Sequence, residues 1–199
     1  MEKTTFSGAV LAGGRSKRMG TDKASVRING RSLLDMQLDK LNAAGVQELL
    51  VSDAAGSKRD IPYGARQVPD ILPGKGPLCG IASALYASSS EFCVILSVDA
   101  AGVTPDTVKK LMDAAENSAA EIVILASEAG LQPLIGVYKC SLAEDALALV
   151  KSGRPAVREL FKEHAPLLLN VPDDSPELLN CNTPKDLEKL TALAAERHQ

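Results

Sequence analysis

Apolar runs of strand length alternate with segments of helical periodicity along most of this sequence. Leucines between residues 33 and 41 repeat at helical spacing, and Gly45 ends that helix before a strand over residues 48–52. A strand that is followed by a helix and then another strand usually pairs in parallel, because the helix makes the crossover. The sequence therefore predicts an α/β chain with three layers, α/β/α, around a mostly parallel sheet.

The other predicted elements continue this alternation. The run over residues 92–98 is apolar almost throughout, which is typical of a central parallel strand buried on both faces. No stretch is long and polar enough to be a linker, so we expect the 199 residues to form one domain, 1–199. Further strands are expected over 6–11, 65–68, 122–126 and 134–138, and further helices over 78–87 and 142–150, from Pro105 after the N-cap Thr104, and from Pro184 after the N-cap Thr183.

Composition excludes several classes of protein. The formal net charge of −3 gives no overall attraction to nucleic acid or to an anionic membrane, so neither partner is expected. The four cysteines are scattered, without a Cys-x-x-Cys pair, and the two histidines are far apart, which argues against zinc. Cys93 is expected to be an ordinary core residue. Without a signal peptide or a membrane-spanning apolar run, we expect a cytoplasmic protein.

The strand over residues 6–11 leads directly into Gly13 and Gly14 and then into a basic loop that contains Arg18 and Lys23. Glycines let backbone N–H groups approach an anion, and the end of a parallel strand is where α/β folds bind ligands. The spacing matches neither a P-loop nor a dinucleotide fingerprint. The residues alone therefore leave two possibilities open: a phosphate site of another kind, or a turn with solvated charges.

Two aspartates follow predicted strands, and Asp99 is expected at the same edge of the sheet as the glycine loop. Asp99 directly follows the apolar run over residues 92–98, and Asp70 follows the predicted strand over 65–68. Mg²⁺ is commonly bound by one or two carboxylates together with substrate phosphate oxygens, which makes Asp99 a candidate ligand. Aspartate is also common in turns, so a structural role is the alternative for both residues. Gly76 and Pro77 predict a tight turn into the helix over 78–87.

The segment Leu11–Lys23 reads Leu-Ala-Gly-Gly-Arg-Ser-Lys-Arg-Met-Gly-Thr-Asp-Lys and resembles the Leu-Ala-Gly-Gly-x-Ser-x-Arg-Met-Gly-x-Asp-Lys motif of the MobA-like nucleotidyltransferases. The resemblance extends from about Phe6 to Leu190. It implies a Rossmann-like, glycosyltransferase-A-like nucleotidyltransferase fold. Three later segments match in the same order: Asp70 with Gly-Pro-Leu-Cys-Gly-Ile at 76–81, the strand 94–98 ending at Asp99, and Asn-Cys-Asn-Thr-Pro-Lys-Asp-Leu at 180–187.

This resemblance assigns roles to particular residues. Arg18, Lys23 and Asp99 are the implied catalytic residues, and Asp99 is the implied ligand of the cofactor Mg²⁺. Asn180 and Asn182 match positions associated with the acceptor. The implied nucleotide-binding residues are Leu11, Ala12, Gly13, Gly14, Lys23, Ser52, Asp70, Gly76 and Asp99.

The implied reaction is transfer of GMP from GTP to the terminal phosphate of a molybdopterin-type cofactor, with release of pyrophosphate. GTP is implied because Leu-Ala-Gly-Gly at 11–14 and Gly-Pro-Leu at 76–78 resemble the guanylyl branch of the family. Molybdoenzymes or cofactor-delivery proteins are the implied protein partners. The alternatives are a sugar-1-phosphate or cobinamide phosphate acceptor, CTP-dependent transfer to the pterin, and a nucleotide-binding delivery module without catalysis.

Two segments depart from the family pattern. Ala100–Val103 stands where the family usually has Met-Pro-Phe. Gln132, which is polar but uncharged, precedes Pro133 where the family often has a basic or polar residue. Loss of the proline predicts a less restrained turn after Asp99.

Overall fold

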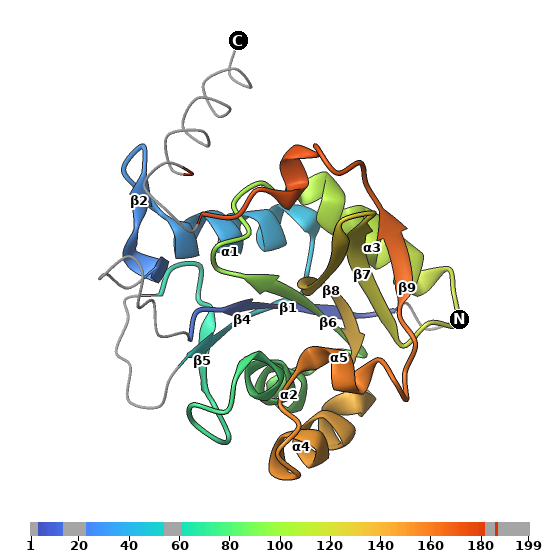
Figure 1. Cartoon of the computed structure of the whole chain (residues 1–199). Helices are drawn as coiled ribbons and strands as arrows, with labels where there is room; N and C mark the ends of the chain where they lie inside the picture. Colours follow the sequence, from blue (N-terminus) through green and yellow to red (C-terminus); the bar gives the residue numbers. More distant parts are fainter. Residues whose placement is uncertain (1–3, 14–22, 54–60, 182–185, 187–199) are drawn as a thin grey trace.

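The computed structural model describes residues 4–13, 23–53, 61–181 and 186. Within these residues the chain forms a seven-stranded sheet with helices on both faces (Figure 1), which confirms the predicted three-layer α/β arrangement. The strands of this sheet are β1 (Phe6–Leu11), β4 (Glu48–Asp53), β5 (Arg66–Pro69), β6 (Phe92–Ser97), β7 (Ile122–Ser127), β8 (Gly130–Lys139) and β9 (Leu167–Asn170).

The strand order is β5-β4-β1-β6-β8-β7-β9. Strands β5, β4, β1 and β6 run parallel, β8 is antiparallel to both β6 and β7, and β9 is parallel to β7. The prediction that β6 is a buried central strand is confirmed, but it is parallel only to β1. From β1 the chain proceeds outward to β4 and β5 and then returns to β6 on the other side of β1. Ligands of open α/β sheets bind at such a switch point.

The helices separate into two layers (Figure 1). Helices α1 (Leu33–Ala44) and α3 (Pro105–Glu116) cover one face of the sheet, and α2 (Pro77–Ala87), α4 (Ala143–Lys151) and α5 (Val157–Leu160) cover the other. None of the described helices is both long enough and apolar enough to span a membrane. The shorter elements are η1 (Lys23–Ser25), β2 (Arg27–Ile28), β3 (Arg31–Ser32), η2 (Cys140–Leu142) and η3 (Pro176–Leu178).

Local signals at the helix ends explain where the two helices of the first layer begin. Ser32 caps α1 by accepting a hydrogen bond from the N–H of Asp35, whose side chain bonds back to the Ser32 N–H. Thr104 caps α3 by accepting a hydrogen bond from the N–H of Thr107, and Pro105 occupies the first turn. Such caps each contribute about 1 kcal/mol, and they fix the angle at which the preceding loop enters the helix.

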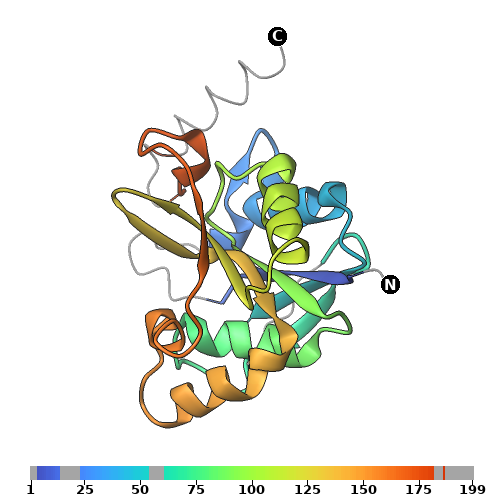
Figure 2. The same cartoon turned by 90° about the vertical axis from the view of Figure 1, so that its right-hand side faces the viewer.

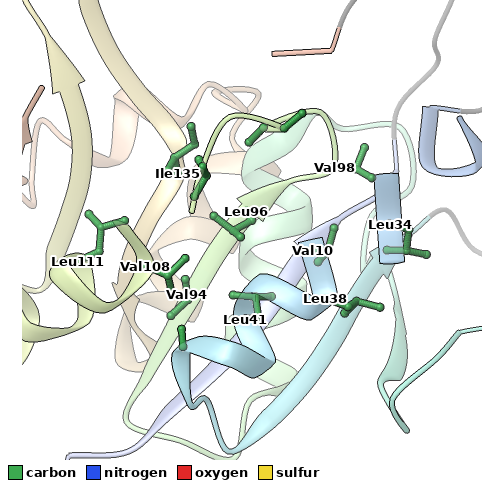
Figure 3. Packing of buried hydrophobic residues seen from close by; sticks show 14 of the residues in the cluster. Val10, Leu34, Leu38, Leu41, Val94, Leu96, Val98, Val108, Leu111 and Ile135 are labelled. Carbon is green, nitrogen blue, oxygen red and sulfur yellow. The ribbon is translucent and has the colours of Figure 1, made fainter. Parts of the chain in front are cut away.

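The apolar face of these two helices packs directly on the centre of the sheet (Figure 3). Leu38 and Leu41 of α1 meet Val10 of β1, while Val108 and Leu111 of α3 lie over the β6 side of the cluster. All five side chains are fully buried. Burial of one such side chain contributes about 1.5–3 kcal/mol, so the two strands that flank the switch point are firmly anchored.

Several parts of the fold differ from the prediction, which also lacked the two-stranded sheet of β2 and β3 and the helix α5. Strand β8 begins at Gly130 rather than near Leu134, and its direction is opposite to that of its neighbours. Strand β9 was not predicted, because it has only four residues and these are largely exposed. Figure 2 shows β9 running beside the β7–β8 hairpin before the chain reaches η3. Of the predicted helix after Thr183, only Asp186 belongs to the described residues, and it is helical.

Candidate nucleotide and metal site

Four parallel strands end at the same edge of the sheet, and each end carries residues that the sequence singled out. Leu11, the last residue of β1, is in register with Ser52 of β4 and with Ser97 of β6. Asp53 of β4 is in register with Pro69, the residue before Asp70. The sheet register therefore places the glycine loop, Ser52, Asp70 and Asp99 along one edge.

The start of the glycine loop is fixed to both neighbouring strands. The N–H groups of Ala12 and Gly13 donate to the carbonyl oxygen of Ser52 at 2.8 and 3.2 Å. The N–H of Val98 donates to the carbonyl oxygen of Leu11 at 3.2 Å. These bonds continue the sheet beyond the strand ends, so the loop leaves from a rigid base. Gly14 and Arg18 lie outside the described residues.

Lys23 returns from the other end of that loop and contacts Asp99. The Lys23 ammonium donates to one carboxylate oxygen of Asp99 at 2.6 Å, and each side chain is 21% exposed. The hydroxyl of Ser97 donates to the other carboxylate oxygen. The sequence predicts Lys23 and Asp99 as site residues separately, and the fold brings them into direct contact across 76 positions of sequence.

Hydrogen bonds to a later segment hold the turn after Asp99, where the sequence predicts less restraint because the proline is missing. The Asp99 carbonyl oxygen accepts from the N–H groups of Ala101 at 2.7 Å and Cys181 at 2.8 Å. The N–H of Gly102 donates to the carbonyl oxygen of Leu179 at 2.9 Å. Contacts with a segment about 80 positions later therefore replace the rigidity that a proline would supply.

Gly102 allows that later segment to lie against the turn. A Cβ atom on Gly102 would stand 1.8 Å from the carbonyl oxygen of Pro176, far inside any allowed contact. The segment from Pro176 to Cys181 therefore packs directly on the Asp99 turn. This places the half-buried Asn180 in the same segment, next to Cys181. Asn182 lies outside the described residues.

A second group of residues forms a small cavity beside the glycine loop. The Ser52 hydroxyl donates to the Asp70 carboxylate at 3.1 Å. Burial raises the pKa of Asp70, and the nearby Asp53 carboxylate raises it further, against a lowering by the Ser52 hydrogen bond. The cavity has a volume of about 70 Å³ and is lined by Leu11, Gly13, Ser52, Asp70, Gly76, Pro77, Gly80, Ser97 and Leu134.

This cavity can hold only part of a nucleotide, because ligand pockets usually measure about 300–1,000 Å³. Gly80 of α2 forms its back wall, and a Cβ there would lie 3.2 Å from the Ser52 hydroxyl oxygen. Gly76 caps α2 at the rim, with Pro77 in the first turn as predicted. Sequence reasoning missed the contributions of Gly80 and Ser97. Ser97 could have been noticed because it stands two residues before Asp99 on the same strand end.

The oxygen ligands at this site suit a divalent cation that also binds a phosphate group of the nucleotide. Among the described residues, no three His, Cys, Asp or Glu side chains are grouped so that they could hold a metal. A partly exposed carboxylate such as that of Asp99 supplies one hard oxygen ligand, and Mg²⁺ takes its remaining ligands readily from phosphates and water. The residues present therefore fit a metal that is shared with a nucleotide.

Comparison with known proteins agrees with this geometry. A family model described as the MobA-like NTP transferase domain matches residues 8–167. A Rhizobium johnstonii protein named Molybdenum cofactor guanylyltransferase is 36% identical over 199 residues, which cover 94% of this chain and 92% of the relative.

Solved structures share the fold. Molybdopterin-guanine dinucleotide biosynthesis protein A from Archaeoglobus fulgidus has a TM-score of 0.76 at 22% identity, covering 96% of this chain and 99% of that chain. A Mycobacterium tuberculosis protein in complex with manganese has a TM-score of 0.70 at 21% identity, covering 96% and 100%. The family model spans most of the chain and the relative spans nearly all of it, so the chain belongs to the MobA-like NTP transferase family.

Proposed function

We propose that this nucleotidyltransferase transfers GMP from GTP to the terminal phosphate of a molybdopterin-type cofactor and releases pyrophosphate. The observation that carries the proposal is the contact between Lys23 and Asp99 at the strand switch point, next to the start of the glycine loop. A basic group and a metal-binding carboxylate are both needed where the triphosphate reacts. The name of the 36% identical relative supports the choice of guanylyl group and acceptor.

The transfer forms one bond and breaks one. An oxygen of the acceptor phosphate attacks the α-phosphorus of GTP, and the bond from that phosphorus to the oxygen bridging the β-phosphorus breaks. The leaving group is pyrophosphate. Because the acceptor phosphate is already ionised near neutral pH, the reaction needs no strong base, and catalysis consists of positioning and charge neutralisation.

Asp99 is the residue that would hold Mg²⁺, with Ser97 orienting its carboxylate. When bound, Mg²⁺ supplies positive charge to the phosphate oxygens and acts as a Lewis acid. The Lys23 ammonium lies on that same carboxylate, at 2.6 Å. We infer that Lys23 turns to the phosphates when the nucleotide enters, joined there by Arg18. Asn180 and Asn182 are proposed to contact the acceptor.

Asp70 is the proposed determinant of base choice. The Watson–Crick edge of guanine presents two adjacent N–H donors, and a carboxylate offers two matching acceptor oxygens. Cytosine and adenine present a ring-nitrogen acceptor beside their amino group, which a carboxylate would repel. Ser52 fixes one Asp70 oxygen at 3.1 Å, and the backbone of Leu11 and Ala12 lies on the adjoining strand end.

With Mg²⁺ present, the protein is expected to bind GTP more tightly than CTP or ATP, by about 5–150-fold, because a good bidentate pair discriminates by about 1–3 kcal/mol. Calorimetry with the three nucleotides measures this preference. Asp70→Asn should reduce it, whereas Asp113→Asn, an exposed position on α3, should leave it unchanged. Equal affinity for all three nucleotides would contradict the proposal.

Pyrophosphate release identifies the acceptor. We expect pyrophosphate to be released from GTP when molybdopterin is the acceptor, and not when a sugar-1-phosphate or cobinamide phosphate is. Pyrophosphate release only with one of the latter two would identify that compound as the acceptor in place of molybdopterin. Delivery of the product to molybdoenzymes or carrier proteins, and a cytoplasmic location, stay predictions.

A further inference from the structure

Helix α1 carries two polar side chains that reach away from its own helix to the turn containing Asp99. The Gln37 amide group donates to the carbonyl oxygen of Val98 at 3.4 Å. The Lys40 ammonium donates to the carbonyl oxygens of Ala100 at 3.3 Å and Ala101 at 3.0 Å. It also donates to the side-chain oxygen of Gln37 at 3.1 Å, which joins the two residues into one unit.

Gln37 is a polar residue within the apolar face of α1. Gln37 has no exposed surface and lies between the fully buried Leu33 and Leu41 on that face. A buried amide is unfavourable unless it is hydrogen-bonded, and an apolar residue would pack here without that requirement. Gln37 therefore depends on the Val98 carbonyl oxygen and the Lys40 ammonium at this buried position, whereas an apolar residue would need neither.

The hydrogen bonds place the pair on both sides of Asp99. Val98 precedes Asp99 and Ala100 follows it, and the carbonyl oxygens of both point to α1. The carboxylate of Asp99 itself contacts Lys23 and Ser97. Helix α1 thus fixes the backbone on either side of the carboxylate without touching the carboxylate. Because α1 is anchored in the core and capped at Ser32, it provides a rigid support.

We propose that Gln37 and Lys40 are positioning residues, which fix the Asp99 turn so that its carboxylate is preorganised for the divalent metal and its nucleotide. The inference rests on the proposed function, in which Asp99 binds the metal. Groups that orient a metal ligand without binding the metal commonly change metal affinity or activity by about 10–100-fold when they are replaced.

The test is Mn²⁺ binding to the protein in the presence of GTP, measured by electron paramagnetic resonance. Lys40→Met keeps the aliphatic stem and removes the donors. We expect the Mn²⁺ concentration at half-saturation to rise by about tenfold or more. Affinity for GTP in EDTA should not change, because the hydrogen bonds of Lys40 described above run to Gln37 and to the turn after Asp99 and not to the small cavity beside the glycine loop. Lys40→Arg, which keeps donors at this position, should recover most of the lost affinity.

Lys109→Met is the matched control, because it makes the same change on the exposed face of the adjacent helix α3. If Lys40→Met does not fold, Lys40→Gln replaces it. This variant retains an amide donor, so the Mn²⁺ concentration at half-saturation should rise by a smaller factor. Gln37→Met tests the other member of the pair by the same measurement. A folded variant with lower thermal stability but parental Mn²⁺ binding would overturn the inference. The binding readout needs no turnover, so a parental protein that binds Mn²⁺ with GTP but transfers no GMP would reject the proposed function alone.

Discussion

Asp99→Asn is expected to reduce GMP transfer by at least about 100-fold, because it removes the carboxylate charge that we propose to bind the metal, and with it the metal's stabilisation of the transition state. Asparagine has nearly the same size and can still accept from Ser97, so the fold should persist. The measurement is pyrophosphate release at saturating GTP and acceptor over a range of Mg²⁺ concentrations. The variant should require more Mg²⁺ as well as turning over more slowly.

Asp113→Asn controls for the general loss of one negative charge, because Asp113 is exposed on α3. It should transfer GMP at the parental rate. An Asp99→Asn variant that kept parental turnover would show that the carboxylate is not part of the reaction. A binding module that delivers the cofactor without catalysis would keep its biological activity in this variant, so a complementation assay separates the two kinds of protein.

Gly102→Ala is expected to have the largest effect on stability. Its Cβ would lie 1.8 Å from the Pro176 carbonyl oxygen, so the segment that leads to Asn180 must move away from the Asp99 turn. Overpacking of this kind costs about 1–3 kcal/mol or more, which lowers the unfolding midpoint by roughly 2–12 °C in a chain of this size. Thermal unfolding by circular dichroism measures the shift, and GMP transfer should fall in the same variant.

Gly153→Ala distinguishes steric overlap from backbone strain. Gly153 has a φ of +81°, and an added Cβ there would meet nothing within 4 Å. Its replacement should therefore cost only the left-handed backbone strain, about 1–2 kcal/mol, and should not change GMP transfer. If Gly102→Ala unfolds and reacts like the parent, the close packing of the two segments does not hold.

Much of the fold could be predicted because its signals are local. Strand β1 begins and ends at the predicted residues, and α1 ends before Gly45 as expected. The antiparallel direction of β8 follows from the tight hairpin between Ser127 and Gly130, which the prediction missed because it began this strand at Leu134. Strand β9 has no strong local sequence pattern that marks it as a strand. It forms by pairing with β7.

Part of the candidate site could also be predicted from the sequence. Ends of parallel strands meet at one edge of a sheet, so Asp99 could be placed beside the glycine loop before the fold was known, whereas Asp70 was assigned to the nucleotide only by the family resemblance. The contact of Lys23 with Asp99 and the support of Asp99 by Lys40 depend on packing between distant segments. No spacing rule relates residue 40 to residue 100, so this second group of residues emerges only from the fold.

The most direct measurement is a crystal structure with Mn²⁺ and a non-hydrolysable GTP analogue, in which anomalous scattering locates the metal. We predict one Mn²⁺ bound to an Asp99 carboxylate oxygen and to the triphosphate, the Lys23 ammonium on phosphate oxygens rather than on Asp99, and guanine beside Asp70. A triphosphate and metal bound away from the edge shared by β1 and β6, with the Lys23–Asp99 pair intact, would contradict the account.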